Sequence, residues 1–213
     1  MSDLKSVRKD YDSDQLLESK INRNPYHLFE QWLKEAEEVE PTDYNAMTIA
    51  TMDGNGFPNL RTVLLRGFNR DGISFFTNYN SDKGKEIAAD NKVGINFFWK
   101  DLERQIRIKG VADKLPETVS DTYFAGRPRE SQIGAWVSEQ SSIIQNREVL
   151  DKLKADAEQR FEGKEIERPS FWGGYHVQIT YFEFWQGRPG RLHDRIAFQM
   201  NANGEWYLER LAP

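Results

Sequence analysis

Arginine, serine, glutamine and aromatic side chains gather in four short stretches of this sequence, where binding chemistry is most expected. The stretches are RTVLLR at 61–66, YFAGRPRESQIGAWVSEQSS at 123–142, FWGGY at 171–175 and EFWQGRPGRLHDR at 183–195. Arginine guanidinium groups match the geometry of phosphate oxygens, and aromatic rings offer a flat stacking surface. Taken singly, each stretch is more often a surface ion pair or a buried aromatic group. Together they indicate a site for a planar ligand that carries phosphate.

The stretch at 61–66 poses a geometric question. Arg61 and Arg66 are five positions apart, so in one regular strand they project from opposite faces. They can serve one ligand only if the strand bends or lies between two sites.

His193 follows Arg191 and precedes Arg195, where a satisfied surface imidazole is the ordinary interpretation. Flanking arginines disfavour protonation of the imidazole, which suits a neighbouring anion or electron-rich ring.

Several classes of site are excluded by what the sequence lacks. The run GNGFPN at 54–59 has no third glycine and lies between two expected strands, so it indicates a turn and not a dinucleotide loop. The chain has no cysteine, which removes disulfides, thiolate metal sites and cysteine nucleophiles. The three histidines, His27, His176 and His193, lack the spacing of a catalytic zinc site, and we expect no metal.

Charge and hydropathy limit the partners. The net charge is -5, so no overall positive field attracts nucleic acid or an anionic membrane, and any anion site must be a local cluster of cations. We find neither the apolar core of a secretory signal nor a run near the roughly 18 residues of a membrane span. With no cysteine present, these features predict a cytoplasmic protein.

The elements that must position these residues are mainly strands. Residues 1–22 are polar and aperiodic, which predicts a flexible N-terminal arm, and 23–213 is expected to form a single domain. Asn24 and Pro25 begin a helix to Val39, and Ser81 caps another to Ala89. Further helices are expected at 116–126 and 146–161. Strands are expected at 46–52, 60–68, 73–79, 93–99, 104–115 with a break at Gly110, 175–185, 195–200 and 206–211.

This pattern predicts a mainly β fold with peripheral helices, an α+β arrangement built on a small antiparallel barrel. In several sequence motifs, the chain resembles the pyridoxamine/pyridoxine 5′-phosphate oxidase family. The resemblance rests on RTVLLRGF, FFTNYNS, LERQIRIKG, GRPRESQIGAWVSEQSS, PSFWGGY, EFWQG, RLHDR and the terminal ERLAP, which occur in the family's order from about residue 8 onward. It implies an antiparallel split β-barrel that binds flavin mononucleotide (FMN) at the interface of a homodimer.

The resemblance also implies roles for individual residues. The substrate phosphate would be held by Arg66, Tyr123, Arg127 and Ser131. Arg191 and His193 would face the substrate ring as the catalytic pair, with Arg8 and Tyr11 of the arm closing over it. FMN would be bound by Arg61, Thr62, Val63, Leu64, Leu65, Arg66, Phe76, Thr77, Lys83, Gln105, Gln140, Ser141, Trp185 and Arg195.

Two positions depart from the family pattern. Arg66 stands where the family usually has a lysine, which keeps the charge but changes reach and geometry. Asp82 stands where the family often has an arginine near the flavin phosphate. A carboxylate would repel phosphate there, so no binding role is expected of Asp82.

The implied activity is oxidation of pyridoxamine or pyridoxine 5′-phosphate by O2 to pyridoxal 5′-phosphate, with release of hydrogen peroxide. Two other functions remain open. One is a different flavin or deazaflavin oxidoreductase of the same fold, against which RLHDR and SQIGAW argue. The other is a non-catalytic module that binds pyridoxal 5′-phosphate.

Overall fold

The computed structural model describes residue 11 and residues 14–213. The chain divides into two compact units, each assembled from separate stretches of sequence. The first unit contains the chain up to Ile49, Gly94–Gly110 and Ile179–Pro213, and the second contains Ala50–Val93 and Val111–Gln178. The single domain at 23–213 stays a prediction. Most of the arm expected at 1–22 lies outside the described residues.

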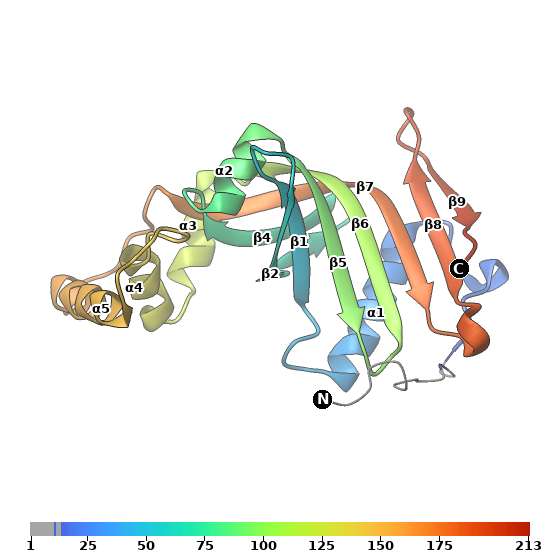
Figure 1. Cartoon of the computed structure of the whole chain (residues 1–213), viewed down its shortest axis with the longest axis horizontal. Coiled ribbons are helices and arrows are strands. Elements are labelled where there is room, and N and C mark those ends of the chain that lie inside the picture. Colours follow the sequence, from blue (N-terminus) through green and yellow to red (C-terminus); the bar gives the residue numbers. More distant parts are fainter. Residues whose placement is uncertain (1–10, 12–13) are drawn as a thin grey trace. The chain divides into compact units, whose positions relative to one another are not determined.

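Antiparallel strands form the framework, and helices are added around them (Figure 1). The hydrogen-bonded strand order among the described residues is β2-β1-β5-β6-β7-β4-β3, with β8 pairing β7 and β9 pairing β8. This confirms the predicted mainly β fold with peripheral helices. The strands are β1 Ala46–Met52, β2 Pro58–Leu64, β3 Gly67–Asn69, β4 Gly72–Asn78, β5 Lys92–Trp99, β6 Arg104–Lys114, β7 Trp172–Gln186, β8 Asp194–Met200 and β9 Trp206–Arg210.

In the second unit, β4 pairs with the first half of β7, from Gly72 opposite Gln178 to Asn78 opposite Trp172. Two glycines of β7 allow aromatic side chains to lie directly on that strand. A Cβ on Gly174 would lie 2.8 Å from Cε1 of Phe76, and one on Gly173 would lie 2.2 Å from the hydroxyl oxygen of Tyr79. The glycines of FWGGY are therefore required by packing.

Four helices complete the second unit: α2 Asp82–Ala89, α3 Glu117–Ala125, α4 Arg129–Val137 and α5 Arg147–Phe161. The Ser81 side chain caps α2 by accepting the Gly84 N–H, as predicted. The last three helices gather together in Figure 1 and share a buried apolar cluster. That cluster is formed by Phe124, Ile133, Ala135, Phe161, Ile166 and Trp172.

The first unit is built on the helix α1, Pro25–Val39, which Asn24 caps by accepting the Tyr26 N–H. Its apolar face carries Phe29 and Trp32, both buried. The Trp32 ring meets Phe184 of β7 edge to face at 5.3 Å. This packing holds α1 against the half of β7 that carries Trp185, one of the predicted site residues. The unit also contains two short 3-10 helices, η1 Glu18–Lys20 and η2 Pro189–Arg191.

Three expectations about the elements were wrong. The strand expected at 60–68 is divided into β2, which ends at Leu64, and β3, which begins at Gly67. β6 continues through Gly110, because alternate residues up to Ala112 face the core and a buried glycine there does not interrupt the pairing. α4 was not predicted; its N-cap is Pro128, whose side chain makes no capping hydrogen bond, so the usual sequence signal of a helix start is missing. None of the helices in the described part of the chain is long and apolar enough to span a membrane.

Candidate functional site

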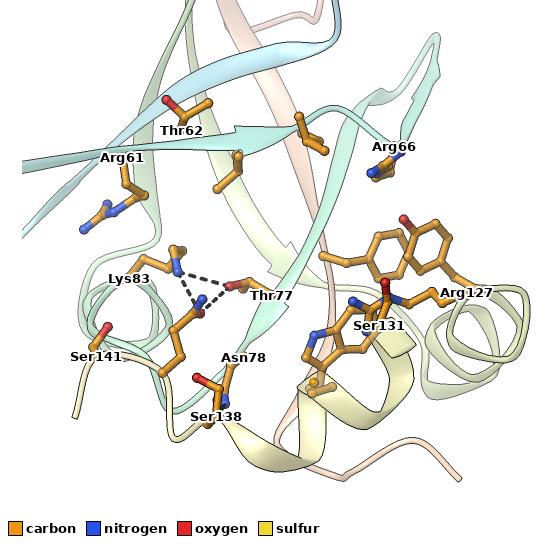
Figure 2. A pocket seen from close by; sticks show the side chains of 18 of the residues that line it. Arg61, Thr62, Arg66, Thr77, Asn78, Lys83, Arg127, Ser131, Ser138 and Ser141 are labelled. Carbon is orange, nitrogen blue, oxygen red and sulfur yellow. Dashed lines mark hydrogen bonds between the residues drawn. The ribbon is translucent and has the colours of Figure 1, made fainter. Parts of the chain in front are cut away.

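The second unit contains a cavity of about 1300 Å³. This volume exceeds the range of roughly 300–1,000 Å³ that suits one drug-sized ligand. Four cationic side chains line it, two at each end (Figure 2). We call the part around Arg61 and Lys83 the lysine end, and the part around Arg66 and Arg127 the arginine end.

At the lysine end, the Lys83 ammonium group is buried and hydrogen bonded. Its Nζ donates to Oγ1 of Thr77 at 3.2 Å and Oε1 of Gln140 at 3.0 Å (Figure 2). It also donates to Oγ of Ser81 at 3.3 Å. Burial, and secondarily the charge of Arg61, lowers the pKa of Lys83 to about 8. All three acceptors are neutral, so the ammonium charge is not cancelled by them. It remains available to an anion below that pH.

Arg61, by contrast, is paired with a carboxylate. Its Nη2 lies 3.0 Å from Oε2 of Glu86 on α2, and its Nη1 donates to Oγ1 of Thr51 at 2.5 Å. The Thr51 hydroxyl in turn donates to Glu86, and Asn59 donates to the other carboxylate oxygen at 2.9 Å. Burial opposes ionisation of Glu86, but these hydrogen bonds and the Arg61 charge leave its pKa below the usual value.

The arginine end is built from stacked rings. Phe76 and Tyr123 lie parallel with centroids 3.7 Å apart, and Trp172 continues the stack 5.6 Å from Phe76. The Arg127 guanidinium lies 4.5 Å from the centroid of the Trp172 ring. Its Nη1 is buried and has no hydrogen-bond partner among the described residues. Burial lowers the pKa of Arg127, which remains charged. This unsatisfied donor fits an anionic ligand oxygen.

Local structure explains how these side chains meet. β2 ends at Leu64, so Arg66 lies beyond the regular strand and lines the same cavity as Arg61. The two arginines therefore do not lie on one regular strand, and the expectation that they project from its opposite faces does not apply. Arg127 lies between α3 and α4, and Ser131 in the first turns of α4 lines the cavity beside it.

The first unit holds a separate group of predicted residues. The His193 ring lies 4.7 Å from that of Trp185 and 5.4 Å from that of Tyr11. Its Nδ1 accepts the Arg188 backbone N–H at 3.1 Å, which places the remaining ring proton of the neutral form on Nε2. Burial, with a smaller contribution from Arg191, lowers the pKa of His193. The sequence predicted this direction from two flanking arginines, but burial is the larger cause and Arg195 does not contribute.

Arg195 belongs to the same unit and pairs in register with Trp185. Its guanidinium contacts Glu183 at 2.9 Å, and this buried carboxylate also accepts from Arg107 at 3.0 Å and from Tyr181 at 3.1 Å. Arg195 is therefore held in a defined position on the sheet. Gln105 lies on β6, two residues before Arg107 and on the same face. Arg191 is exposed in η2 with a φ of 62°.

The structure thus gathers most predicted residues into two groups. Leu65 is an exception, because its side chain is buried and does not line the cavity. Arg8 lies outside the described residues. Asp82 lines the cavity, and its backbone N–H donates to Oγ of Ser141 at 3.2 Å. The predicted residues that line the cavity are Arg61, Thr62, Val63, Leu64, Arg66, Phe76, Thr77, Lys83, Tyr123, Arg127, Ser131, Gln140 and Ser141.

The sequence did not identify the residues that hold the cationic side chains of the cavity in place. Glu86 follows Lys83 by three positions on α2, a spacing that could have indicated a shared face. Trp172 was seen only as part of an aromatic stretch. Among the described residues, no three histidine, cysteine or acidic side chains are arranged to hold a metal ion.

Two sequence families match this chain. Residues 33–159 match the family described as pyridoxamine 5′-phosphate oxidase. Residues 172–213 match the pyridoxine 5′-phosphate oxidase C-terminal dimerisation region. The family points to flavin binding, and the second match supports a homodimer.

Relatives match over the whole length. The pyridoxine/pyridoxamine 5′-phosphate oxidase of Flavobacterium johnsoniae is 47% identical over 213 residues, covering 100% of both chains. The enzyme of the same name from Cupriavidus metallidurans is 44% identical, again over 100% of both.

Solved structures confirm the predicted split-barrel fold. PhzG from Burkholderia lata, in complex with tetrahydrophenazine-1-carboxylic acid, has a TM-score of 0.87 and 26% identity and covers 94% of this chain and 98% of its own. A pyridoxamine 5′-phosphate oxidase-related, FMN-binding protein from Nostoc punctiforme has a TM-score of 0.70 and 16% identity, covers 91% of this chain and 100% of its own, and supports the fold alone. On the sequence matches, the chain belongs to the pyridoxamine 5′-phosphate oxidase family.

Proposed function

We propose that this protein is an FMN-dependent oxidase that converts pyridoxamine 5′-phosphate and pyridoxine 5′-phosphate to pyridoxal 5′-phosphate with O2. Full-length relatives with 44–47% identity carry the corresponding name. The structural observation that carries the proposal is the unpartnered, buried Nη1 of Arg127 in a cavity lined by four cationic side chains. We propose a homodimer as the working form, in line with the dimerisation region at 172–213.

The lysine end fits the phosphate of FMN. Arg61 and Lys83 supply two cations there, and Ser141, Gln140 and Thr77 supply neutral polar groups. A charged donor next to a phosphate oxygen forms a short, strong hydrogen bond. The cavity exceeds the space that one ligand needs, which leaves room for a substrate ring beside the flavin.

The arginine end is assigned to the substrate phosphate. Arg66 and Arg127 supply charge, and the hydroxyls of Tyr123 and Ser131 supply neutral hydrogen bonds. Charge-assisted hydrogen bonds contribute about 1.5–3 kcal/mol each, enough to reject vitamers that lack phosphate. The stack on Phe76 and Trp172 fixes the orientation of Tyr123 and Arg127 before the substrate arrives.

The residues of the first unit are assigned to the ring systems. We propose that Trp185, Arg195 and Gln105 contact the flavin, and that Arg191, His193, Tyr11 and Arg8 contact the substrate. Because the pKa of His193 is lowered, its imidazole is neutral at physiological pH and can donate from Nε2. It can orient an oxygen or nitrogen on C4′ of the substrate without adding positive charge.

When bound, FMN supplies the two-electron acceptor that this oxidation requires. The alcohol substrate loses two electrons and two protons to become the aldehyde, and O2 gains them to become hydrogen peroxide. The amine loses the same two electrons, and water then replaces its nitrogen, which leaves as ammonia. The protein's own task is to hold C4′ in place and exclude competing reactions.

Two measurements test the proposal. The purified protein should show the visible absorption of bound flavin, and it should release peroxide with pyridoxine 5′-phosphate and O2. A flavin-loaded protein that oxidises a nicotinamide but not this substrate would favour another flavin oxidoreductase. A protein that stays colourless with added FMN yet binds pyridoxal 5′-phosphate would favour a non-catalytic binding module.

A further inference from the structure

Glu86 on α2 is the carboxylate paired with Arg61 at the lysine end, and every hydrogen bond it makes there bears on Arg61. Its side chain is only 10% exposed. One of its oxygens contacts both Nη2 of Arg61 and the hydroxyl of Thr51, which itself accepts from Nη1 of Arg61. The other oxygen accepts from Asn59, whose backbone carbonyl accepts from Nη1 at 2.9 Å. Glu86, Thr51 and Asn59 therefore form a closed hydrogen-bond network around the guanidinium.

This network uses only part of the hydrogen-bonding capacity of Arg61. A guanidinium carries five N–H groups in a rigid plane. The bonds to Glu86, Thr51 and Asn59 engage Nη1 and Nη2, and no described residue accepts from Nε. Because Arg61 also lines the cavity, part of its donor edge remains for a ligand there. Fixing one edge of the plane fixes the direction of the other.

We infer that Glu86 is a positioning residue, which holds the guanidinium of Arg61 so that its free donor edge meets the phosphate of the flavin. The inference rests on the proposed function, because it requires FMN phosphate at the lysine end. Glu86 makes no contact with the ligand in this account; it acts through Arg61.

Considered by charge alone, Glu86 should weaken the binding of FMN phosphate and not strengthen it. A carboxylate near a phosphate site reduces its positive potential, so removing Glu86 should then strengthen anion binding. Two features counter this simple expectation. A free arginine side chain loses rotamer entropy when it binds, whereas the network has already ordered Arg61. The charges of Asp82 and, to a smaller extent, Glu86 also oppose the lowering of the Lys83 pKa, so Glu86 helps to keep that ammonium protonated.

The experiment compares two flavins on the apoprotein. FMN and riboflavin share the ring system but differ in phosphate, so the ratio of their dissociation constants isolates the phosphate contact. Quenching of flavin fluorescence gives both constants without any turnover. We expect Glu86→Gln to weaken FMN binding on the order of tenfold, the loss of about one charge-assisted hydrogen bond, and to leave riboflavin binding within about twofold.

Matched variants separate positioning from folding. Lys85→Gln alters an exposed neighbour on the same helix and should change neither constant. Arg61→Ala should weaken FMN at least as much as Glu86→Gln, and the double variant should be no weaker than Arg61→Ala, because the effect of Glu86 passes through Arg61. If Glu86→Gln does not fold, Thr51→Val removes the shared hydroxyl and should give a smaller loss in the same direction.

The outcomes distinguish this inference from the proposed function. If the unmodified protein binds FMN no better than riboflavin, the proposed function fails at the lysine end. If it prefers FMN but Glu86→Gln keeps that preference, or loses both flavins equally, the positioning role is overturned while the oxidase remains. Tighter FMN binding by Glu86→Gln would show that simple charge repulsion prevails.

Discussion

The two ends of the cavity hold their cations in different ways. At the lysine end, Arg61 is paired with Glu86, and Lys83 is surrounded by neutral acceptors. At the arginine end, no described carboxylate forms an ion pair with Arg66 or Arg127, and the latter is held by the face of Trp172. One end is ordered by hydrogen bonds and partly neutralised, and the other is ordered by rings and keeps its charge.

This difference suits the two proposed ligands. A cofactor that stays bound through many turnovers benefits from a pre-ordered site, since ordering costs are met before binding. A substrate that must arrive and leave benefits from a strong field in a site that stacking has already shaped. A ring can hold an arginine in place without cancelling its charge, whereas a carboxylate partly cancels it.

The largest expected effect involves Arg191, which belongs to neither end. Arg191→Leu should lower kcat on the order of 100-fold, as expected when one charge-stabilising donor is lost from a reacting centre. The flavin content should change little. Steady-state kinetics together with the flavin absorbance per protein tests this. Equal loss of flavin and turnover would remove Arg191 from the catalytic group.

The next effect distinguishes the two ends directly. Arg127→Ala should raise KM by roughly 10- to 100-fold, because about 1.5–3 kcal/mol of phosphate binding is lost, while kcat falls much less. The FMN dissociation constant should not change. Arg127→Lys should recover only part of the loss, since lysine keeps the charge but not the planar geometry. An unchanged KM would place the substrate phosphate elsewhere.

The pH dependence of ligand binding should also differ between the lysine end and the arginine end. The pKa of Lys83 is lowered to about 8, so this group is charged at pH 7 and largely neutral at pH 9. FMN phosphate is already a dianion over that range. FMN binding to the apoprotein should therefore weaken by several-fold, at most about tenfold, between pH 7 and 9.

Two comparisons sharpen that pH prediction. Lys83→Met should bind FMN more weakly and with a flat pH profile. The substrate KM of the FMN-saturated enzyme should lack this transition, since both cations of the arginine end are guanidinium groups that stay charged. A step of equal size in both profiles would mean that the ends are not independent.

Local sequence rules predicted the start of the helix that carries Lys83, but they did not predict contacts between residues far apart in the sequence. Ser81 was expected to cap α2, and this cap places Lys83 one residue into the helix. The pairing of Arg61 with Glu86 joins residues 25 positions apart, and no periodicity indicates such a contact. The residues of both ends were assigned from the family resemblance. The stack of Phe76, Tyr123 and Trp172 depends on close packing over the β7 glycines, which the sequence did not foretell.

The smallest expected effect tests the Tyr123 hydroxyl at the arginine end. Tyr123→Phe keeps the stack on Phe76 and removes one hydroxyl. KM should rise by roughly three- to tenfold, in keeping with about 0.5–1.5 kcal/mol for a neutral hydrogen bond. The thermal midpoint should stay within about 2 °C of the unmodified protein, since no apolar contact is lost. A large fall in Tm would show that the hydroxyl serves the fold instead of the substrate.

The assignment of one phosphate to each end can be tested most directly by phosphorus NMR of the protein with FMN and pyridoxal 5′-phosphate bound together. Two bound signals are expected. Arg61→Lys should shift only the FMN phosphorus, and Arg127→Lys only that of pyridoxal 5′-phosphate. If Arg127→Lys instead shifts the FMN signal and leaves the other unchanged, the two ends have been assigned to the wrong ligands.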